Sequence, residues 1–414
     1  MNKFYVFNAG CIRRCLDCVW IKKYLEVNGW QMVGSPKKAD LIIVSTCGVV
    51  SKNEENSLLA VAQAVQGKKD NAKTVITGCL TKINPDSLNA LGEFYHVPSG
   101  SLEEMDKIVK PRIPITEVHH PDSVKDGGAL TDYLIARSFC RSSDTYKSLF
   151  DKYAMNNTFL RASVVYGKIL GNVKSLFSSR NIKKILPYYN IKIADGCKSI
   201  CTYCATRFAT KKLRSRSVGS ILEDFDLGLE NGYEIFQLLS EDSGCYGLDI
   251  NSSITELLTS IFERDKDFKV ILIDFNPWWL IKQQEQLIPL LKMNQDKVKE
   301  IFLPFQSGSD KILGLMEREY RSDELISVLK LLRKEAPMIP IRTSALVGFP
   351  SEDDADFEDT KRVIQEVDFA EVAVNRYEDR PGTASSSMPG KLSQDIIEFR
   401  ARYLVENLNC KMLS

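Results

Sequence analysis

The chain has 414 residues, the length of two or three domains, and 44% of them are hydrophobic, which is enough for sizeable cores. Its 55 Lys and Arg balance 54 Asp and Glu, so the net charge of +1 excludes a global attraction to nucleic acid and leaves only a local basic patch. No apolar run is as long as the ~18 residues of a membrane helix, and the N-terminus is not a signal peptide. We therefore expect a cytoplasmic protein without a membrane partner, whose eleven cysteines are thiols or metal ligands.

In the first third of the chain, each of three predicted strands is followed by a cysteine. The strands lie at 4–7, 41–44 and 74–77, and the cysteines after them are Cys11, Cys47 and Cys79. Helices are predicted between the strands, at 20–28 and 54–66. This alternation predicts a parallel sheet, in which the carboxyl ends of the strands share one ligand-binding edge. We expect the three thiols to converge there on an iron–sulfur cluster with one open iron; three buried free thiols are the plainer alternative.

A second set of three cysteines competes with this one. Cys11, Cys15 and Cys18 have the spacing C-x3-C-x2-C, and the last two stand at the start of a predicted helix. Cys15 and Cys18 could be extra ligands, redox thiols or packing residues. We favour the strand-end set because the same placement after a strand occurs three times.

The stretch at 113–187 is predicted to be an insertion between a first domain at 1–112 and a last domain at 188–414. Its basic residues are interleaved with Tyr and Phe. Such a pattern can bind RNA or an acidic peptide, or it can form a helical cap with a solvated charged face.

Directly after a predicted strand at 189–194 comes the most specific pattern in the chain. Cys197, Cys201 and Cys204 have the spacing C-x3-C-x2-C. Thiolates are soft ligands that suit iron–sulfur clusters and zinc. Three ligands on a cluster of four irons leave one iron open for a cofactor or substrate. A structural zinc site would need a fourth Cys or His close by, and no His follows Cys204.

From this point six predicted strands alternate with helices. The strands are at 189–194, 234–239, 268–273, 299–303, 340–346 and 369–374. The helices are at 220–231, 254–264, 282–293, 322–335 and 354–366. Six strands are too few for a complete eight-stranded barrel, and chemistry is expected at their carboxyl ends.

Short motifs in this last domain resemble one known family. The cysteine loop reads DGCKSICTYCATRFATKKLRSR and is similar to the radical SAM loop of the methylthiotransferases. The strand ends that follow carry SEDSGCYGLD, NP, LPFQSGSD, VGFPSE and NRYEDRPGTA, in the family's order. The first two resemble SEDTGAYGRD and NP of the archaeal and eukaryotic tRNA threonylcarbamoyladenosine branch. The resemblance covers about 190–384, and the GC, TC and GC contexts of Cys11, Cys47 and Cys79 agree with it.

The resemblance implies an α/β protein with an N-terminal parallel-sheet methylthiotransferase domain and a partial (β/α)6 radical SAM barrel. It implies two [4Fe-4S] clusters, one on Cys197, Cys201 and Cys204 and an auxiliary one on Cys11, Cys47 and Cys79. S-adenosylmethionine (SAM) would bind the open iron of the first cluster and yield a 5'-deoxyadenosyl radical; the auxiliary cluster would carry the sulfur. The residues expected to line SAM are Tyr203, Ser215, Arg216, Ser240, Glu241, Asp242, Gln306, Ser307 and Gly348, and Arg216 is expected to pair with the SAM carboxylate.

The substrate is less well determined by the sequence. Only ten residues follow Leu404, whereas the family continues with an RNA-binding TRAM domain, so we expect that domain to be absent. We favour methylthio transfer to an unactivated C–H bond of a peptide or protein side chain. The alternative is a tRNA of the threonylcarbamoyladenosine type. The third hypothesis is a sulfur-inserting or otherwise divergent radical enzyme acting on a small molecule, or a catalytically inactive binding protein. An electron donor such as flavodoxin or ferredoxin is expected.

Overall fold

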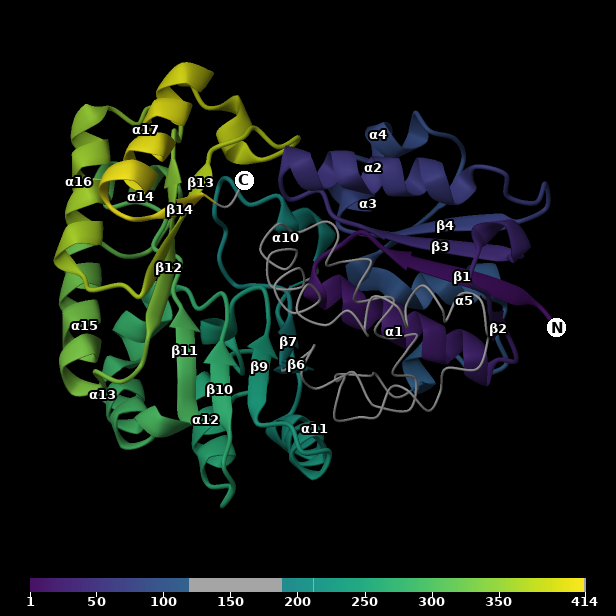
Figure 1. The fold of residues 1–414 in the computed structure, drawn as a ribbon, viewed down its shortest axis with the longest axis horizontal. Coiled ribbons are helices and arrows are strands. Elements are labelled where there is room, and N and C mark those ends of the chain that lie inside the picture. The colour runs from purple at the N-terminus through teal and green to yellow at the C-terminus, as the bar shows by residue number, and fades with distance from the viewer. Residues whose placement is uncertain (119–187, 211, 413–414) are drawn as a thin grey trace, which may run out of the picture. The chain divides into compact units, whose positions relative to one another are not determined.

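The computed structural model describes residues 1–118, 188–210 and 212–412. Its contacts divide the chain into two compact units, Met1–Tyr189 and Asn190–Ser414 (Figure 1). Most of the predicted insertion at 113–187, from residue 119 to residue 187, lies outside the described residues. Its helical character and its RNA-binding or peptide-binding surface therefore stay predictions.

The first unit is built on a five-stranded parallel sheet in the order β2-β1-β3-β4-β5. The strands are β1 (Lys3–Asn8), β2 (Gln31–Met32), β3 (Leu41–Thr46), β4 (Lys73–Gly78) and β5 (Tyr95–Pro98). The register pairs Asn8 with Ser45 and Thr46 with Gly78, so the carboxyl ends of β1, β3 and β4 are level. This arrangement confirms the predicted N-terminal parallel sheet.

Helices cover both faces of this sheet, and Figure 1 shows α1 and α2 on opposite sides of it. The helices are α1 (Ile12–Val27), α2 (Ser51–Val65), α3 (Leu80–Ile83), α4 (Pro85–Asn89) and α5 (Met105–Val109), with short 3-10 turns η1 (Pro36–Lys38), η2 (Ser99–Glu104) and η3 (Ile115–Glu117). Alternate residues of each strand feed the two cores: Ile43 packs with residues of α1, and Ile42 packs with residues of α2. All six residues of β3 are buried, as expected for a central strand with both faces covered.

Two boundaries in this unit differ from the prediction. Helix α1 begins at Ile12, directly after Cys11, and not at residue 20. The first domain also extends beyond residue 112, because Ile115 and Val118 are buried in its core and Trp20 Nε1 donates to the Val118 carbonyl at 2.9 Å.

The second unit contains a seven-stranded sheet in the order β14-β13-β12-β11-β10-β9-β6, parallel from β9 to β14. The strands are β6 (Tyr188–Lys192), β9 (Ile235–Leu239), β10 (Lys269–Leu272), β11 (Val298–Phe302), β12 (Ile341–Val347), β13 (Glu371–Arg376) and β14 (Lys411–Met412). A two-stranded antiparallel pair, β7 (Ala194–Asp195) and β8 (Arg214–Ser215), flanks the cysteine loop. All six predicted strands of this unit are confirmed, and β14 is an addition.

Helices follow the strands in the expected alternation. They are α10 (Thr206–Ala209), α11 (Val218–Glu230), α12 (Ile254–Phe262), α13 (Pro277–Met293), α14 (Asp310–Leu315), α15 (Ser322–Glu335), α16 (Asp354–Glu366) and α17 (Gln394–Asn407), with 3-10 turns η5 (Ser243–Cys245), η6 (Gln295–Lys297) and η7 (Ala384–Ser387). Helix α13 begins at Pro277, earlier than the predicted residue 282. The Asn276 side chain accepts from the Trp278 N–H and Pro277 occupies the first turn, which together start a helix.

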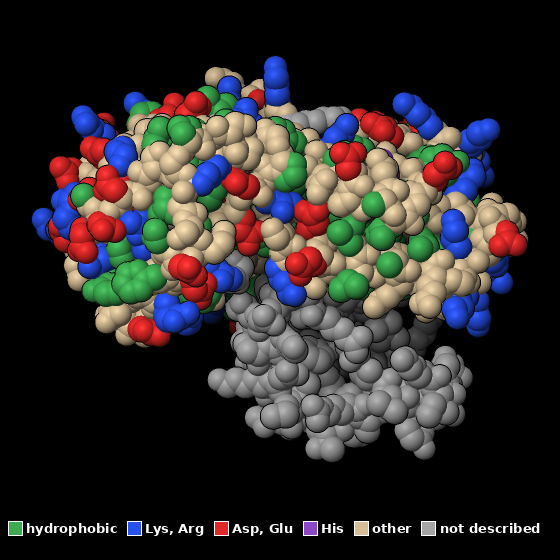
Figure 2. Space-filling view, turned by 90° about the horizontal axis from the view of Figure 1, so that it is seen from above, with side chains coloured by type: hydrophobic (Ala, Val, Ile, Leu, Met, Phe, Trp, Pro, Cys, Tyr) green, Lys and Arg blue, Asp and Glu red, His purple; other side chains and the backbone are tan. Residues whose placement is uncertain are grey.

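The surface of the described residues is mixed in character. Figure 2 shows Lys and Arg side chains interspersed with Asp and Glu side chains on the face drawn, in keeping with the net charge of +1. Within the described ranges, none of the helices combines the length and the apolar character that crossing a bilayer requires.

A buried ion pair stabilises the carboxyl end of β12, and we expect its loss to destabilise the second unit. Arg400 Nη1 lies 2.6 Å from Glu352 Oε1, and both side chains are almost fully buried. Replacing Arg400 by Met would leave the carboxylate buried without its cation, so we expect the free energy of unfolding to fall by about 3–5 kcal/mol. Urea unfolding followed by circular dichroism measures the change. The matched control is Arg402→Met, an exposed arginine on the same helix, which should change stability by less than about 0.5 kcal/mol. Equal midpoints for the two variants would contradict this assignment.

Candidate active site

The cysteine loop at 196–204 begins at the end of β7 and is fixed by the neighbouring strand ends. The Gly196 N–H donates to Glu241 Oε2 at 2.8 Å, just beyond β9. Asn276, just beyond β10, donates from Nδ2 to Ser199 Oγ at 3.1 Å. The first half of the loop is thus held by polar groups at the carboxyl ends of two neighbouring strands, where the alternation of strands and helices predicts chemistry.

The second half of the loop is held through Thr202. Its N–H donates to the Met316 carbonyl at 3.2 Å and its hydroxyl to the Leu315 carbonyl at 2.8 Å. The Ser385 N–H in turn donates to the Thr202 carbonyl at 3.1 Å. The segments after β11 and β13 therefore also fix the loop that carries the three cysteines.

A cation lies beside one of these cysteines. Arg318 Nη1 is 3.8 Å from Cys201 Sγ, and Arg318 Nη2 donates to the Pro304 carbonyl at 2.7 Å. Burial, followed by the charge of Cys201, raises the pKa of the Cys204 thiol. Neighbouring buried thiols do not ionise together without a compensating positive charge, which Arg318 and bound iron would both provide. Three thiols on one loop, with a cation beside Cys201, offer the ligand chemistry that suits an iron–sulfur cluster.

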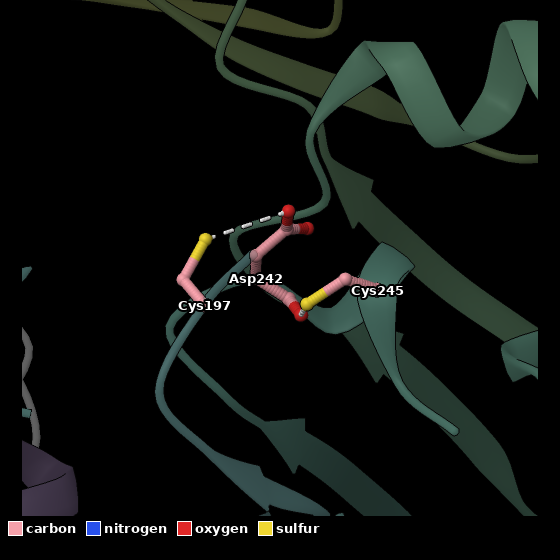
Figure 3. A group of neighbouring side chains, drawn as sticks. All are labelled: Cys197, Asp242 and Cys245. Carbon is pink, nitrogen blue, oxygen red and sulfur yellow. Dashed lines mark hydrogen bonds between the residues drawn. The ribbon is translucent and has the colours of Figure 1, made fainter. Parts of the chain in front are cut away.

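Asp242 is the polar centre of the strand end after β9. Its carboxylate accepts from the backbone N–H groups of Gly244 and Asn276, each at 3.1 Å, and from Trp279 Nε1 at 2.8 Å. Its Oδ2 atom is 3.8 Å from Cys197 Sγ (Figure 3). Only 3% of the residue is exposed, and this burial raises the pKa of its carboxyl. The predicted site residue Asp242 thus contacts a predicted cluster ligand.

Cys245 is the third member of a side-chain group that also contains Cys197 and Asp242. Cys197 lies on the cysteine loop and Cys245 on η5, with Asp242 between them (Figure 3). The ligand atoms of the three residues all lie within 4.8 Å of one another. The Cys245 S–H donates to the Asp242 carbonyl at 3.2 Å. The neighbouring Cys197 side chain, followed by burial, raises the pKa of the Cys245 thiol.

The other residues predicted to line SAM occupy three kinds of place. Glu241 holds the start of the cysteine loop, and the Ser240 hydroxyl accepts from the Asp242 N–H at 3.3 Å, so both shape the strand end. Tyr203 packs edge-on against Phe349, with ring centroids 6.5 Å apart. The Ser215 hydroxyl accepts from the Gly247 N–H at 2.9 Å. Their contacts with SAM stay predictions.

Gln306 and Gly348, two residues predicted to line SAM, both have a positive backbone φ angle. Gln306 has φ of 69°, a left-handed conformation that is rare outside glycine and that clusters at functional sites. Gly348 has φ of 83°, and a Cβ there would lie 2.4 Å from a side-chain carbon of Ile397. Position 348 therefore requires glycine. In this conformation the Gly348 N–H donates to Glu352 Oε1 at 3.0 Å.

Arg216 and Ser307 contact neighbouring helices, and their predicted roles toward SAM stay predictions. The Arg216 guanidinium pairs with Asp224 at 2.7 Å and also donates to the Ser220 hydroxyl, so it is bound to α11. Ser307 is fully buried; its hydroxyl accepts from the Ser309 N–H at 3.2 Å and lies 3.4 Å from Thr360 Oγ1 on α16. Both residues support the fold around the site.

Sequence reasoning missed three residues of the site. Trp279 and Arg318 contact Asp242 and Cys201, but neither stands in a pattern with a spacing that indicates chemistry. Cys245 is within the SEDSGCYGLD stretch, and its identity was the only signal that could have found it.

The three strand-end cysteines of the first unit lie at the carboxyl ends of neighbouring strands. Cys11 follows β1, Cys47 directly follows β3 and Cys79 directly follows β4. Burial and the charge of Cys11 raise the pKa of Cys47 to about 11, and burial, together with the charges of Cys47 and Cys11, raises the pKa of Cys79. The pKa values of Cys47 and Cys79 are thus raised in part by neighbouring strand-end thiols.

Gly78 permits the close approach of β3 and β4 at this edge. Its φ is 97°, and a Cβ there would lie 2.2 Å from the Thr46 carbonyl oxygen. The Cys79 N–H donates to that carbonyl at 3.0 Å. The glycine before Cys79 is therefore needed to place its thiol beside Cys47.

The competing set of Cys11, Cys15 and Cys18 is not favoured by the structure. Cys15 and Cys18 are fully buried in the hydrophobic core under α1, together with Ile21 and Tyr24. Arg14, which lies on the same helix, pairs with Asp17 at 2.7 Å; its charge lowers the pKa of Cys47 and Cys79, against the effect of burial. Thiols packed among aliphatic and aromatic side chains are packing residues.

Comparison with known proteins agrees with this geometry. Residues 191–364 match the model of the radical SAM superfamily, and residues 3–97 match that of an uncharacterized protein family, UPF0004. A probable threonylcarbamoyladenosine tRNA methylthiotransferase of Pyrococcus horikoshii is 30% identical over 405 residues, which are 98% of this chain and 83% of that protein. A ribosomal protein uS12 methylthiotransferase RimO of Clostridium tetani is 28% identical over 98% of this chain and 81% of that protein.

A solved structure shares the fold. The radical SAM methyltransferase TsrM of Kitasatospora setae, with cobalamin and a [4Fe-4S] cluster bound, superposes with a TM-score of 0.62 at 11% identity, over 93% of this chain and 77% of that one. Fold and cysteine loop define a radical SAM enzyme, a fold that implies a [4Fe-4S] cluster and SAM. The chain belongs to the radical SAM methylthiotransferase family.

The relatives bear on the predicted substrates. The relatives from Pyrococcus horikoshii and Clostridium tetani, and a third from Thermotoga maritima, are named for tRNA or for ribosomal protein uS12. The tRNA alternative is therefore better supported than the peptide reading that the sequence favoured, and these names give the small-molecule hypothesis no support.

Proposed function

We propose that Cys197, Cys201 and Cys204 hold the [4Fe-4S] cluster that binds and reductively cleaves SAM. When bound, this group would supply one electron to SAM, whose C–S bond then breaks to give methionine and a 5'-deoxyadenosyl radical that can abstract hydrogen from an unactivated carbon. The chain's own contribution is rigidity, because the loop is anchored at Gly196, Ser199 and Thr202. Preorganised contacts of this kind hold reacting groups in register and exclude water.

We propose that Cys11, Cys47 and Cys79 hold an auxiliary cluster in the first unit. Three observations support this assignment. The carboxyl ends of β1, β3 and β4 are level, the charge of Cys11 contributes to the raised pKa of Cys47, and Gly78 lets β4 approach β3 just before Cys79. Arg14 would add a positive charge beside a group of thiolates. The auxiliary cluster would supply the sulfur, and the expected electron donor would supply electrons to the chemistry of the second unit.

We infer that the substrate is a tRNA carrying threonylcarbamoyladenosine. The observation that carries this inference is the 30% identity, over nearly the whole chain, to a relative named for that substrate. The stretch from Ser240 to Asp249, which resembles the same branch, lies against the cysteine loop: Asp242 contacts Cys197, and Asp249 Oδ2 accepts from the Ser215 N–H at 2.8 Å. The branch-like motif is thus part of the candidate site.

A protein side chain is the second candidate. The relative from Clostridium tetani is named for ribosomal protein uS12 and is almost as similar, at 28%. Both candidates require methylthio transfer to an unactivated C–H bond, so they differ only in what reaches the site.

Mass spectrometry of reaction products distinguishes the two. Anaerobically reconstituted protein is incubated with SAM, dithionite and a sulfide source, together with tRNA that carries threonylcarbamoyladenosine. We expect digested nucleosides to show that adenosine with the added mass of one methylthio group. The control is the same tRNA made without the threonylcarbamoyl group, and a parallel reaction contains purified uS12. Because a protein that binds tRNA contacts its phosphate groups, the affinity of this chain for tRNA should also fall steeply with added salt.

Two results would contradict the tRNA proposal. One is 5'-deoxyadenosine formation without any methylthio nucleoside. The other is a methylthio group found on uS12 and not on tRNA, which would establish the second candidate.

A further inference from the structure

Cys245 is a buried thiol next to a proposed cluster ligand, and the proposed function gives it no role. It is 0% exposed, and its sulfur lies within 4.8 Å of Cys197 Sγ and of a carboxylate oxygen of Asp242 (Figure 3). The family stretch SEDTGAYGRD has alanine at this position. The thiol therefore distinguishes this chain from that pattern.

The hydrogen bonds of this group depend on the proton of Cys197. While Cys197 is a thiol, it donates to Asp242 Oδ2 at 3.8 Å, and Cys245 donates to the Asp242 carbonyl at 3.2 Å. A cysteine that binds iron loses its proton, so the Cys197 sulfur then becomes a negatively charged acceptor. Hydrogen bonds to charged acceptors are stronger than those to neutral ones. A hydrogen bond from the Cys245 thiol to the Cys197 thiolate is then stronger than one to the Asp242 carbonyl, so the single proton of Cys245 favours Cys197.

Asp242 acts as a hydrogen-bond acceptor in this group. Its carboxylate accepts from Trp279 Nε1 and from two backbone N–H groups, so its oxygens are already engaged by other donors. The Ser199 N–H, 3.2 Å from Cys197 Sγ, is a backbone donor from the loop itself. The Cys245 thiol, within 4.8 Å of Cys197 Sγ, would add a second donor from a different strand end.

We propose that Cys245 is a positioning residue whose S–H donates to Cys197 and thereby raises the reduction potential of the cluster bound there. This inference rests on the proposed ligands Cys197, Cys201 and Cys204. One-electron reduction by a low-potential reductant adds negative charge that is shared by the ligand sulfurs. A donor to one of those sulfurs stabilises the reduced form more than the oxidised form, so the potential rises. The consequence is easier delivery of the electron that SAM cleavage consumes.

The test is a redox titration of the reconstituted full chain, monitored by electron paramagnetic resonance with dithionite as reductant. The signal of this cluster is identified as the one that changes when SAM is added. We expect Cys245→Ala to shift the midpoint potential to a more negative value. Cys245→Ser keeps a donor, and its midpoint should lie at or above that of the wild type. The matched control is Cys410→Ala, which removes another buried thiol of the same unit and should leave the midpoint unchanged.

The outcomes separate this inference from the proposed function. If Cys245→Ala keeps the wild-type iron content and the wild-type midpoint, the inference is overturned while the cluster ligands stand. If Cys245→Ser shifts as far negative as Cys245→Ala, packing and not hydrogen bonding sets the potential, and the inference is again overturned. If Cys245→Ala fails to hold iron, the serine variant decides, because a midpoint below wild type contradicts the role of the donor. A wild-type protein without a SAM-sensitive signal contradicts the proposed ligands themselves.

Discussion

Cys201→Ala, prepared anaerobically with iron and sulfide, is expected to lose about four irons per chain and all formation of 5'-deoxyadenosine. Cys201 is the buried member of its set, and Arg318 stands beside its sulfur. Two thiolates cannot hold a cluster that needs three protein ligands and an open iron. Iron analysis and chromatography of 5'-deoxyadenosine after addition of SAM and dithionite measure both effects.

The control for this variant is Cys410→Ala in the same unit. Cys410 is also buried, but its sulfur donates only to the Leu408 carbonyl at 3.6 Å, so iron content and SAM cleavage should be those of the wild type. A Cys201→Ala protein that retained its iron and its SAM cleavage would refute the ligand assignment.

Cys79→Ala is expected to lose about four irons as well, but with a different effect on activity. Methylthio transfer should stop, because the proposed source of sulfur is gone. Formation of 5'-deoxyadenosine should continue, since the proposed ligands of the SAM-binding cluster are all in the second unit. Iron analysis, 5'-deoxyadenosine and methylthio product are measured on the same preparation.

Cys15→Ala is the matched control for the first unit. Cys15 belongs to the competing C-x3-C-x2-C spacing but lies in the hydrophobic core, so its loss should leave about eight irons per chain and a small loss of stability. Iron loss in Cys15→Ala together with a full complement in Cys79→Ala would transfer the auxiliary site to Cys11, Cys15 and Cys18.

Much of the fold could be predicted from local sequence because its signals are local. Apolar runs followed by cysteine, such as 41–44 before Cys47, mark strands, and the observed register levels the carboxyl ends of these strands. The six later strands follow from the same alternation of apolar runs and helical stretches. Both sets of cysteines follow such strands in the sequence.

What the sequence could not provide is the partner of each polar side chain. Arg216 follows the cysteine loop in a family-like position, yet its guanidinium pairs with Asp224, in the second turn of α11. Ser307 belongs to a motif that otherwise reaches the strand ends, but its hydroxyl is buried toward α16. Trp279 reaches Asp242 only because α13 begins earlier than predicted, at Pro277. Such contacts depend on how elements distant in sequence pack together.

The iron content of the anaerobically reconstituted wild-type chain tests the central assignment most directly. Two separate sets of three cysteines, one after three parallel strands of the first unit and one on the loop after β7, predict about eight irons per chain. About four irons or fewer, in a preparation that cleaves SAM with full activity, would contradict a two-cluster enzyme.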